Sequence, residues 1–234
     1  MTKSEQQTQT NRLNSSYRTK QMVILALIAA IAYAVTFVCR LPIIPAIGFV
    51  DLEFKSAVIL IGGFIFGPMS GFIMTVVVCL LEMITFSSTG IIGCIMNILA
   101  TACIVVPASF VYKKKSSPLG ATVGLAAGVL LMTVAMVLWN YLVTPIYMGV
   151  PREAVEALLL PAFVPFNLLK GALNGAAAML LYKFVLAALE KSNLIPKERN
   201  QEKNSISSII GVVIVSLLVL LTCVLIILAF NGVF

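Results

Sequence analysis

The chain contains a succession of apolar runs, several of them long enough to cross a lipid bilayer. A helix rises about 1.5 Å per residue, so about 20 apolar residues cross a hydrocarbon core about 30 Å thick. Hydrophobic residues make up 60% of the 234 residues and charged residues only 11%, and a soluble domain of this length could not bury so much apolar surface. The sequence therefore predicts an integral membrane protein.

The spans are expected to be helical, because a backbone in lipid must satisfy its own hydrogen bonds and no segment alternates as a barrel strand would. The second span stops at Gly67-Pro68, which is either a tight interfacial turn or the break of a single helix. The fold class predicted is an all-α bundle of six helices with a seventh helix at the carboxyl end. The predicted spans are residues 22–39, 55–66, 70–86, 90–112, 120–147, 160–189 and 209–230.

The predicted organisation has four parts. Residues 1–21 form an amino-terminal segment that is too long and too mixed in charge for a cleaved signal peptide, so the first span is retained as a membrane helix. Residues 22–190 form a membrane domain of six helices, residues 191–208 a charged linker, and residues 209–234 an accessory transmembrane helix.

Most basic residues fall on one side of the predicted topology, and the positive-inside rule makes that side the cytoplasm. The prediction is a multi-pass protein of the cell membrane with a cytoplasmic amino terminus. Its net charge of +7 is then explained by loops that face anionic lipid, not by nucleic-acid binding. The basic residues on this side are Lys3, Arg12, Arg18, Lys20, Lys113, Lys114, Lys115, Lys183, Lys191, Lys197, Arg199 and Lys203.

Enzyme chemistry finds little support in the sequence. There is no histidine and no phosphate-binding loop, and no nucleophile is paired with a recognisable base, so no catalytic residue, metal or cofactor is predicted. The five cysteines fall in apolar runs without metal-ligand spacing and are expected to be small core residues. They are Cys39, Cys79, Cys94, Cys103 and Cys223.

Polar side chains gather in two regions of the predicted outer half of the membrane, where each one is costly unless it is paired or lines a wet cavity. In the predicted topology both regions lie on the same face and could close over one pocket. The first region contains Arg40, Asp51, Glu53 and Lys55; the second contains Trp139, Asn140, Tyr147 and the run from Pro161 to Lys170.

The run of residues 164–171 is the most informative part of the second region. Asn167 and Lys170 are three residues apart and therefore share a helix face, while Pro165 suits the first turn of a helix. Asn140 lies in the fifth span, and its amide offers a donor and an acceptor to the edge of a flat heterocycle. Alternatively, the two asparagines tie helices together and Lys170 extends to the membrane surface.

Aromatic side chains near these amides suit the faces of such a ring. The candidates are Trp139, Tyr147 and Phe166, which are expected to sandwich the ligand.

From about residue 20 to residue 189 the chain resembles the S component, the substrate-binding subunit, of energy-coupling-factor (ECF) vitamin transporters. The motifs that carry the resemblance to the riboflavin-specific branch are Trp139-Asn140-Tyr141 to Pro145-Ile146-Tyr147, and Pro165-Phe166-Asn167-Leu168-Leu169-Lys170-Gly171. The turn Gly62-Gly63-Phe64-Ile65-Phe66-Gly67-Pro68 is also similar to that family.

The resemblance implies high-affinity capture of riboflavin from outside the cell, with Asn140, Asn167 and Lys170 at flavin-contacting positions. It also implies three partners: a transmembrane coupling protein and two ATP-binding subunits, which alone use ATP. In the riboflavin branch an acidic residue commonly precedes the second helix, and Asp51 or Glu53 could occupy that position. The alternative substrate is another vitamin, such as thiamine or pantothenate.

The first span carries a face of small residues that would let another helix approach closely. Ala26, Ala30 and Ala34 repeat every fourth residue, and Ala29 and Ala32 widen the face. In the family a similar alanine pattern meets the coupling protein, whereas an ordinary packing face within the chain explains the pattern equally well.

Glu82 is set deep in the third span and could contact the ligand, pair with Lys55 or Lys170, or carry protons. Proton transport would make the chain an ion-coupled secondary transporter. Against this alternative, the sequence shows no inverted repeat and only one such acidic site. A purely structural membrane scaffold remains the other alternative.

Overall fold

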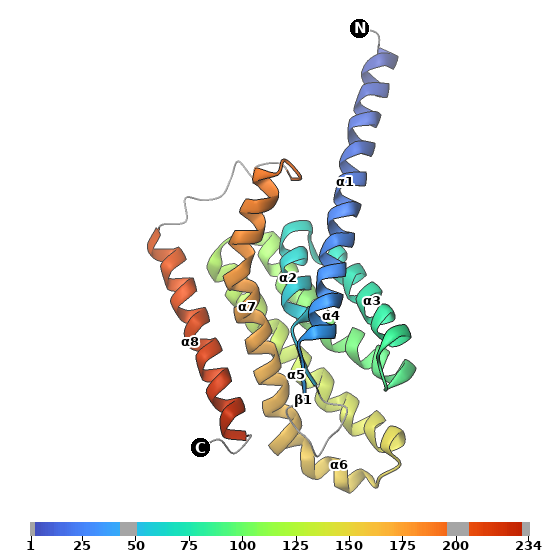
Figure 1. The fold of residues 1–234 in the computed structure, drawn as a ribbon, viewed down its shortest axis with the longest axis vertical. Helices are drawn as coiled ribbons and strands as arrows, with labels where there is room; N and C mark the ends of the chain where they lie inside the picture. The colour runs from blue at the N-terminus through green and yellow to red at the C-terminus, as the bar shows by residue number, and fades with distance from the viewer. Residues whose placement is uncertain (1–2, 43–50, 196–205, 231–234) are drawn as a thin grey trace.

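The computed structural model describes residues 3–42, 51–195 and 206–230, and nearly all of them are helical. Within these ranges five helices are long and apolar enough to cross a membrane, and two apolar helices are shorter (Figure 1). The elements in chain order are α1 (Lys3–Val38), β1 (Arg40–Pro42), β2 (Asp51–Glu53), α2 (Lys55–Phe66), α3 (Pro68–Thr85), α4 (Gly90–Lys114), α5 (Pro118–Met148), α6 (Arg152–Leu158), the π-helix η1 (Leu159–Phe163), α7 (Val164–Lys191) and α8 (Ile206–Phe230).

The Gly67-Pro68 segment is a tight turn between two helices and not the break of a single helix. Gly67 has φ 95°, a conformation that favours glycine, and Pro68 begins α3 where its missing N–H is harmless. The two helices then fold back on each other, since a Cβ added to Gly71 would lie only 3.4 Å from the Cα of Gly63. The predicted span of residues 55–66 coincides with α2.

The amino-terminal helix is longer than predicted. α1 begins at Lys3, although its membrane-spanning part begins only near Arg18, and its first turns project past the other helices (Figure 1). Polar helix formers in that segment carry no apolar periodicity, so the hydropathy pattern missed them. The predicted linker falls partly on residues 196–205, which lie outside the described residues.

The segment before α2, which was predicted to be a loop between two helical spans, contains two short strands. β1 and β2 form a short antiparallel ribbon, with Arg40 opposite Glu53 and Pro42 opposite Asp51. Strands of three residues are too short to produce a readable alternation in sequence.

The predicted sixth span is divided by a π-helical turn. Pro161 and Pro165 each lack a backbone N–H, so neither can donate the usual helical hydrogen bond. Between the two prolines the helix forms a wider π-turn, in which the N–H of Val164 donates to the carbonyl of Leu159, five residues back. Pro165 lies in the first turn of α7, as predicted. Such π-turns often accompany functional sites.

The helices pack around a core that includes the fully buried Ile59, Leu60 and Ile104. α4 and α5 cross closely at glycine, because a Cβ added to Gly128 would meet the carbonyl oxygen of Ile104 at 2.7 Å. The cysteines are all free; Cys79, Cys94 and Cys223 are buried, and Cys103 is partly buried. The prediction of a core position was wrong for Cys39, which is exposed just beyond the end of α1.

Candidate functional site

A polar cavity lies where the β1–β2 ribbon, the carboxyl end of α5 and the start of α7 meet. Figure 1 shows these elements in the lower part of the view. Its volume is about 40 Å³, enough for a few water molecules at roughly 10–15 Å³ each on the same measure. Six of the predicted ligand-binding residues line it: Asp51, Glu53, Asn140, Phe166, Asn167 and Lys170. The structure thus brings together both polar regions of the sequence, while their contact with a ligand stays a prediction.

Three other predicted residues lie elsewhere. Trp139 and Tyr147 line a smaller adjoining hollow of about 10 Å³, which shares Thr89 and Met96 with the main cavity. Glu82 does not line the cavity; it is buried on α3, where its carboxylate pairs with Lys55. Of the pairings considered for Glu82, the structure therefore shows the one with Lys55.

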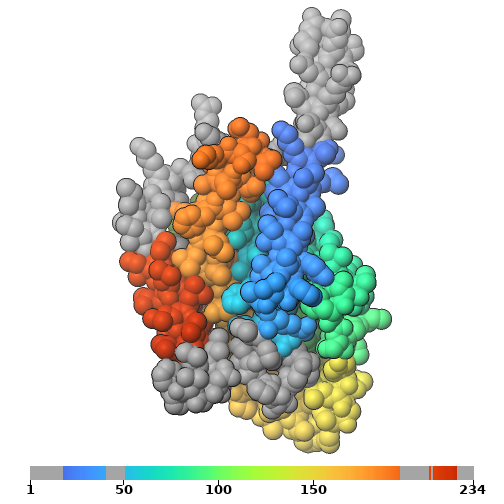
Figure 2. Space-filling view, viewed as in Figure 1, coloured from blue at the N-terminus to red at the C-terminus, as the bar shows by residue number. Residues whose placement is uncertain are grey.

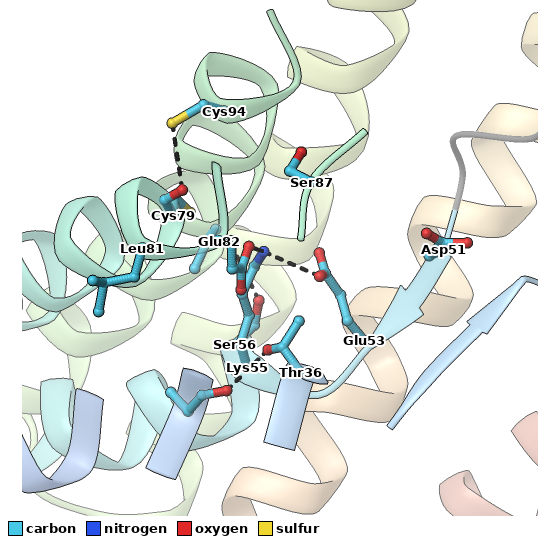
Figure 3. A network of polar contacts seen from close by, with 12 residues as sticks. Thr36, Asp51, Glu53, Lys55, Ser56, Cys79, Leu81, Glu82, Ser87 and Cys94 are labelled. Carbon is cyan, nitrogen blue, oxygen red and sulfur yellow. Dashed lines mark hydrogen bonds and ion pairs between the residues drawn. The ribbon is translucent and has the colours of Figure 1, made fainter. Parts of the chain in front are cut away.

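A chain of ion pairs runs from the cavity into the bundle. The Lys170 ammonium donates to Glu53 Oε1 at 2.9 Å, and the Lys55 ammonium lies 3.1 Å from Glu53 Oε2 and also donates to Glu82 Oε2. Figure 3 shows Glu53, Lys55 and Glu82 pointing toward one another from β2, α2 and α3. Lys55 is fully buried, so two carboxylates provide the compensation that a buried ammonium requires.

These ion pairs keep the carboxyl group of Glu53 ionised. Burial by itself would raise the pKa of this carboxyl group, but the ammonium groups of Lys170 and Lys55 outweigh burial and lower the pKa from 4.5 to about 2. Glu53 therefore presents a negative charge at the wall of the cavity at neutral pH. Lys170 does not extend to the membrane surface, because it is held by Glu53 and by the carbonyl of Asp51.

Arg40 connects three segments at the rim of the cavity. Its guanidinium group forms an ion pair with Asp51 across the ribbon and lies 5.7 Å from the centre of the Phe86 ring, between α3 and α4. A cation within about 6 Å of a ring face is attracted to it. Arg40 therefore ties the end of α1, the ribbon and the α3–α4 turn together.

The two predicted amides do not tie helices together. Asn140 donates to the carbonyl of Met136 within α5, and Asn167 donates to the carbonyl of Phe163, at the end of the adjoining π-helix; each bond spans four residues and measures 2.7 Å. Asn140 also accepts from the hydroxyl of Thr144. Each amide keeps a second N–H, and Asn167 Oδ1 has no hydrogen-bond partner among the described residues, so both amides retain capacity for a ligand.

Asn174 connects the helices instead, and the sequence reasoning missed it. Its Oδ1 accepts from the N–H of Ala57, while its Nδ2 donates to the carbonyls of Glu53 and Lys170, each at 2.9 Å. The side chain is fully buried and holds the start of α2 against α7. Its spacing of four residues from Lys170 and seven from Asn167 was the available signal, because these positions share one helix face.

Asn97 is a third amide at the cavity, contributed by α4, and was also missed. Its place within an apolar span could have identified it, since a polar group at membrane depth needs a partner or a wet cavity. Thr89, at the amino end of α4, lines the cavity as well. The cavity therefore has walls from four helical regions and the ribbon.

The predicted partner-binding face on α1 is open. Ala26, Ala30 and Ala34 are exposed, whereas Ala29 and Ala32 are buried against the bundle. Packing within the chain therefore accounts for the second pair of alanines and leaves the first three uncovered by the described residues.

Comparison with known proteins places this arrangement in a family. The family described as "ECF transporter, substrate-specific component" matches residues 20–182. A solved structure described as "Structure and mechanism of the S component of a bacterial ECF transporter" is similar with a TM-score of 0.65 and 28% identity, over 74% of this chain and 99% of its own.

Similar curated proteins include two bacterial transporters. The riboflavin transporter RibU of Staphylococcus aureus (strain TCH60) is 29% identical over 171 residues, which is 70% of this chain and 89% of that protein. The riboflavin transporter FmnP of Bacillus subtilis (strain 168) is 26% identical over 163 residues, 66% of this chain and 85% of that protein. Because the family match covers more than half of the sequence, the chain belongs to the substrate-specific components of ECF transporters.

Proposed function

We propose that this protein captures riboflavin from outside the cell and delivers it as the S component of an ATP-driven ECF transporter. It catalyses no reaction and needs no cofactor; riboflavin is its cargo, and ATP is used only by partner subunits. The observation that carries the proposal is that Asn140, Asn167 and Lys170, from α5 and α7, line one cavity. Similar proteins, whose own sequences are 85–89% covered, are named riboflavin transporters.

The chemistry of the cavity suits a flavin. The pyrimidine edge of the flavin ring alternates carbonyl oxygens with an N–H, and amide groups can donate to the former and accept from the latter. Lys170 adds a charged donor, and Phe166 offers an aromatic face to the ring. A site built from such groups rejects ligands that leave them unpaired.

The cavity must widen to admit this ligand. Its volume is about 40 Å³, whereas pockets for drug-sized ligands are roughly 300–1,000 Å³. Lys170 is also occupied by Glu53 and the Asp51 carbonyl. Binding therefore exchanges these internal hydrogen bonds for bonds to the ligand as the ribbon and the start of α7 separate.

The partners follow from the family. A transmembrane coupling protein docks on the exposed alanines of α1, and two ATP-binding subunits drive the cycle. The amino terminus is cytoplasmic, since the basic segments then face the side on which those subunits act. The chain lies in the plasma membrane among lipids and binds no nucleic acid.

Riboflavin titration of the purified protein tests the substrate. Trp139 is the single tryptophan and lines the hollow beside the cavity, so its fluorescence should be quenched as the flavin binds. Lys170→Gln removes a charged hydrogen bond worth about 1.5–3 kcal/mol and should weaken binding roughly 10- to 100-fold. Lys191→Gln, at the exposed end of α7, is the matched control and should bind as the parent does.

Two results would redirect the proposal. Quenching by thiamine or pantothenate, with none by riboflavin, would keep the family and replace the substrate. Uptake by the protein alone in liposomes, driven by a pH gradient, would support the ion-coupled alternative; the ECF mechanism requires the coupling protein, the ATP-binding subunits and ATP.

A further inference from the structure

A second cavity, far larger than the polar one, lies between α5, α7 and α8. Its volume is about 690 Å³, and its walls are almost entirely apolar. α8 runs along the outer side of α7, at the edge of the molecule away from α3 (Figures 1 and 2). The family match ends at residue 182, within α7, so α8 lies outside the matched residues, whereas the walls that α5 and α7 contribute lie within them.

The helices that frame this cavity could have closed it but do not. α7 presents Gly171 and Gly175 on one face, a spacing that lets a neighbouring helix approach closely. The three atoms nearest to a Cβ added to Gly175 would nevertheless all belong to Leu125 of α5, at 3.6–3.9 Å, so no atom of α8 would lie closer than these. A space of this size does not stay empty within hydrocarbon, because its walls would lose their dispersion contacts.

The dimensions of the cavity match one leaflet of a bilayer. Its lining on α5 extends from Pro118 to Leu130, about 18 Å along the axis at 1.5 Å per residue. Half of a hydrocarbon core is about 15 Å. The end at Pro118 adjoins the lysines 113–115, so the cavity runs from the basic end of the bundle toward the bilayer centre.

One polar side chain lies beyond the basic end of the cavity, and another lies on its α8 wall. Lys183 follows Met179, a lining residue, by one helical turn, so it continues the row of Gly175 and Met179 beyond the cavity. It forms no ion pair with any residue that the structure describes. Ser216 on α8 lines the cavity and is only 6% exposed.

We propose that α5, α7 and α8 hold one anionic phospholipid from the leaflet on the basic side, with an acyl chain in this cavity and the phosphate at Lys183. The apolar walls take the chain, the unpaired ammonium takes the phosphate, and the Ser216 hydroxyl faces the bound lipid. α8 thereby acts as a clamp that keeps the lipid against the six-helix domain. The proposal does not depend on which substrate the protein transports.

Native mass spectrometry of the detergent-purified full chain tests the lipid proposal. The protein is offered equal amounts of phosphatidylglycerol and phosphatidylcholine with identical acyl chains. The parent should retain one lipid and prefer phosphatidylglycerol severalfold. Ala126→Phe fills the cavity from α5 and should lose the lipid, whereas Ala127→Phe, on the exposed side of the same helix and outside the lining, should retain it. Lys183→Gln should bring the preference close to parity, and Lys20→Gln on α1 should leave it unchanged.

Several outcomes would overturn the proposal. Equal retention by Ala126→Phe and Ala127→Phe would show that the lipid binds elsewhere, and an unchanged lipid preference in Lys183→Gln would remove the phosphate contact. A dimer that Ala126→Phe disrupts would assign the cavity to a second copy of the chain. Should Ala126→Phe fail to fold by circular dichroism, Val215→Phe fills the same cavity from α8, with the exposed Leu217→Phe as its control.

Discussion

The buried ammonium of Lys55 offers the sharpest test of the ion-pair chain. Lys55→Met keeps the length of the side chain but removes its charge, which leaves Glu53 with Lys170 alone and Glu82 without a cation. Breaking a buried pair by removing one partner costs about 3–5 kcal/mol. For a chain of this size 1 kcal/mol shifts the Tm by about 2–4 °C, so the expected loss is roughly 6–20 °C.

The second substitution separates charge from packing. Glu82→Gln added to Lys55→Met restores neutrality, because Lys170 then compensates Glu53. The double variant should therefore recover a large part of the lost Tm, measured by circular dichroism in detergent. Lys191→Met, exposed at the end of α7, is the control and should change stability by at most about 0.5 kcal/mol.

A Tm for Lys55→Met within about 2 °C of the parent would refute the reasoning, since that shift corresponds to less than about 1 kcal/mol. A double variant no more stable than Lys55→Met would show that the lost side-chain packing, not the uncompensated carboxylate, caused the change.

Three further predictions concern the site and its partner. Asn174→Ala removes two hydrogen bonds of 2.9 Å that join α7 to α2 and β2 and a third within α7, and it should lower the Tm by several degrees and weaken riboflavin binding in the fluorescence titration. The pKa of Glu53 is about 2 when folded and 4.5 when unfolded, so its stabilising charge is complete above pH 4.5 and lost as the pH falls toward 2; Glu53→Gln should flatten the fall in Tm between about pH 5 and 3. Ala30→Phe on the exposed face of α1 should abolish co-purification with the coupling protein while riboflavin binding persists. The control Ala127→Phe should leave both co-purification and riboflavin binding unchanged. Normal co-purification of Ala30→Phe would place the docking face elsewhere.

Local sequence patterns were sufficient to predict the positions of the membrane helices, because each long apolar run indicates one helix. α2 and most of α4 and α5 have the predicted bounds because lipid forces an apolar segment of that length into a helix. The β1–β2 ribbon and the π-turn before α7 were missed. The first depends on pairing between segments with no periodic signal, and the second on how the chain rearranges around Pro161 and Pro165.

The candidate site shows the same division. Asn140, Asn167 and Lys170 were readable because a polar side chain in an apolar run is costly, and its presence needs a reason. Asn174 and Asn97 follow the same rule but were overlooked. The packing of α2 against α7 showed the part of Asn174, and the cavity that α4 shares with α7 showed that of Asn97.

The sequence by itself therefore showed that lipid surrounds this protein, and it gave the number and order of the main helices and most of the polar groups of the cavity. These features are readable because the free energy of placing a side chain in lipid depends mainly on that side chain. Only the tertiary structure decided which charges pair, that Lys55 is enclosed between Glu53 and Glu82, and that α8 leaves a large cavity beside α7. Those outcomes depend on distances between residues far apart in the chain, which no local pattern encodes.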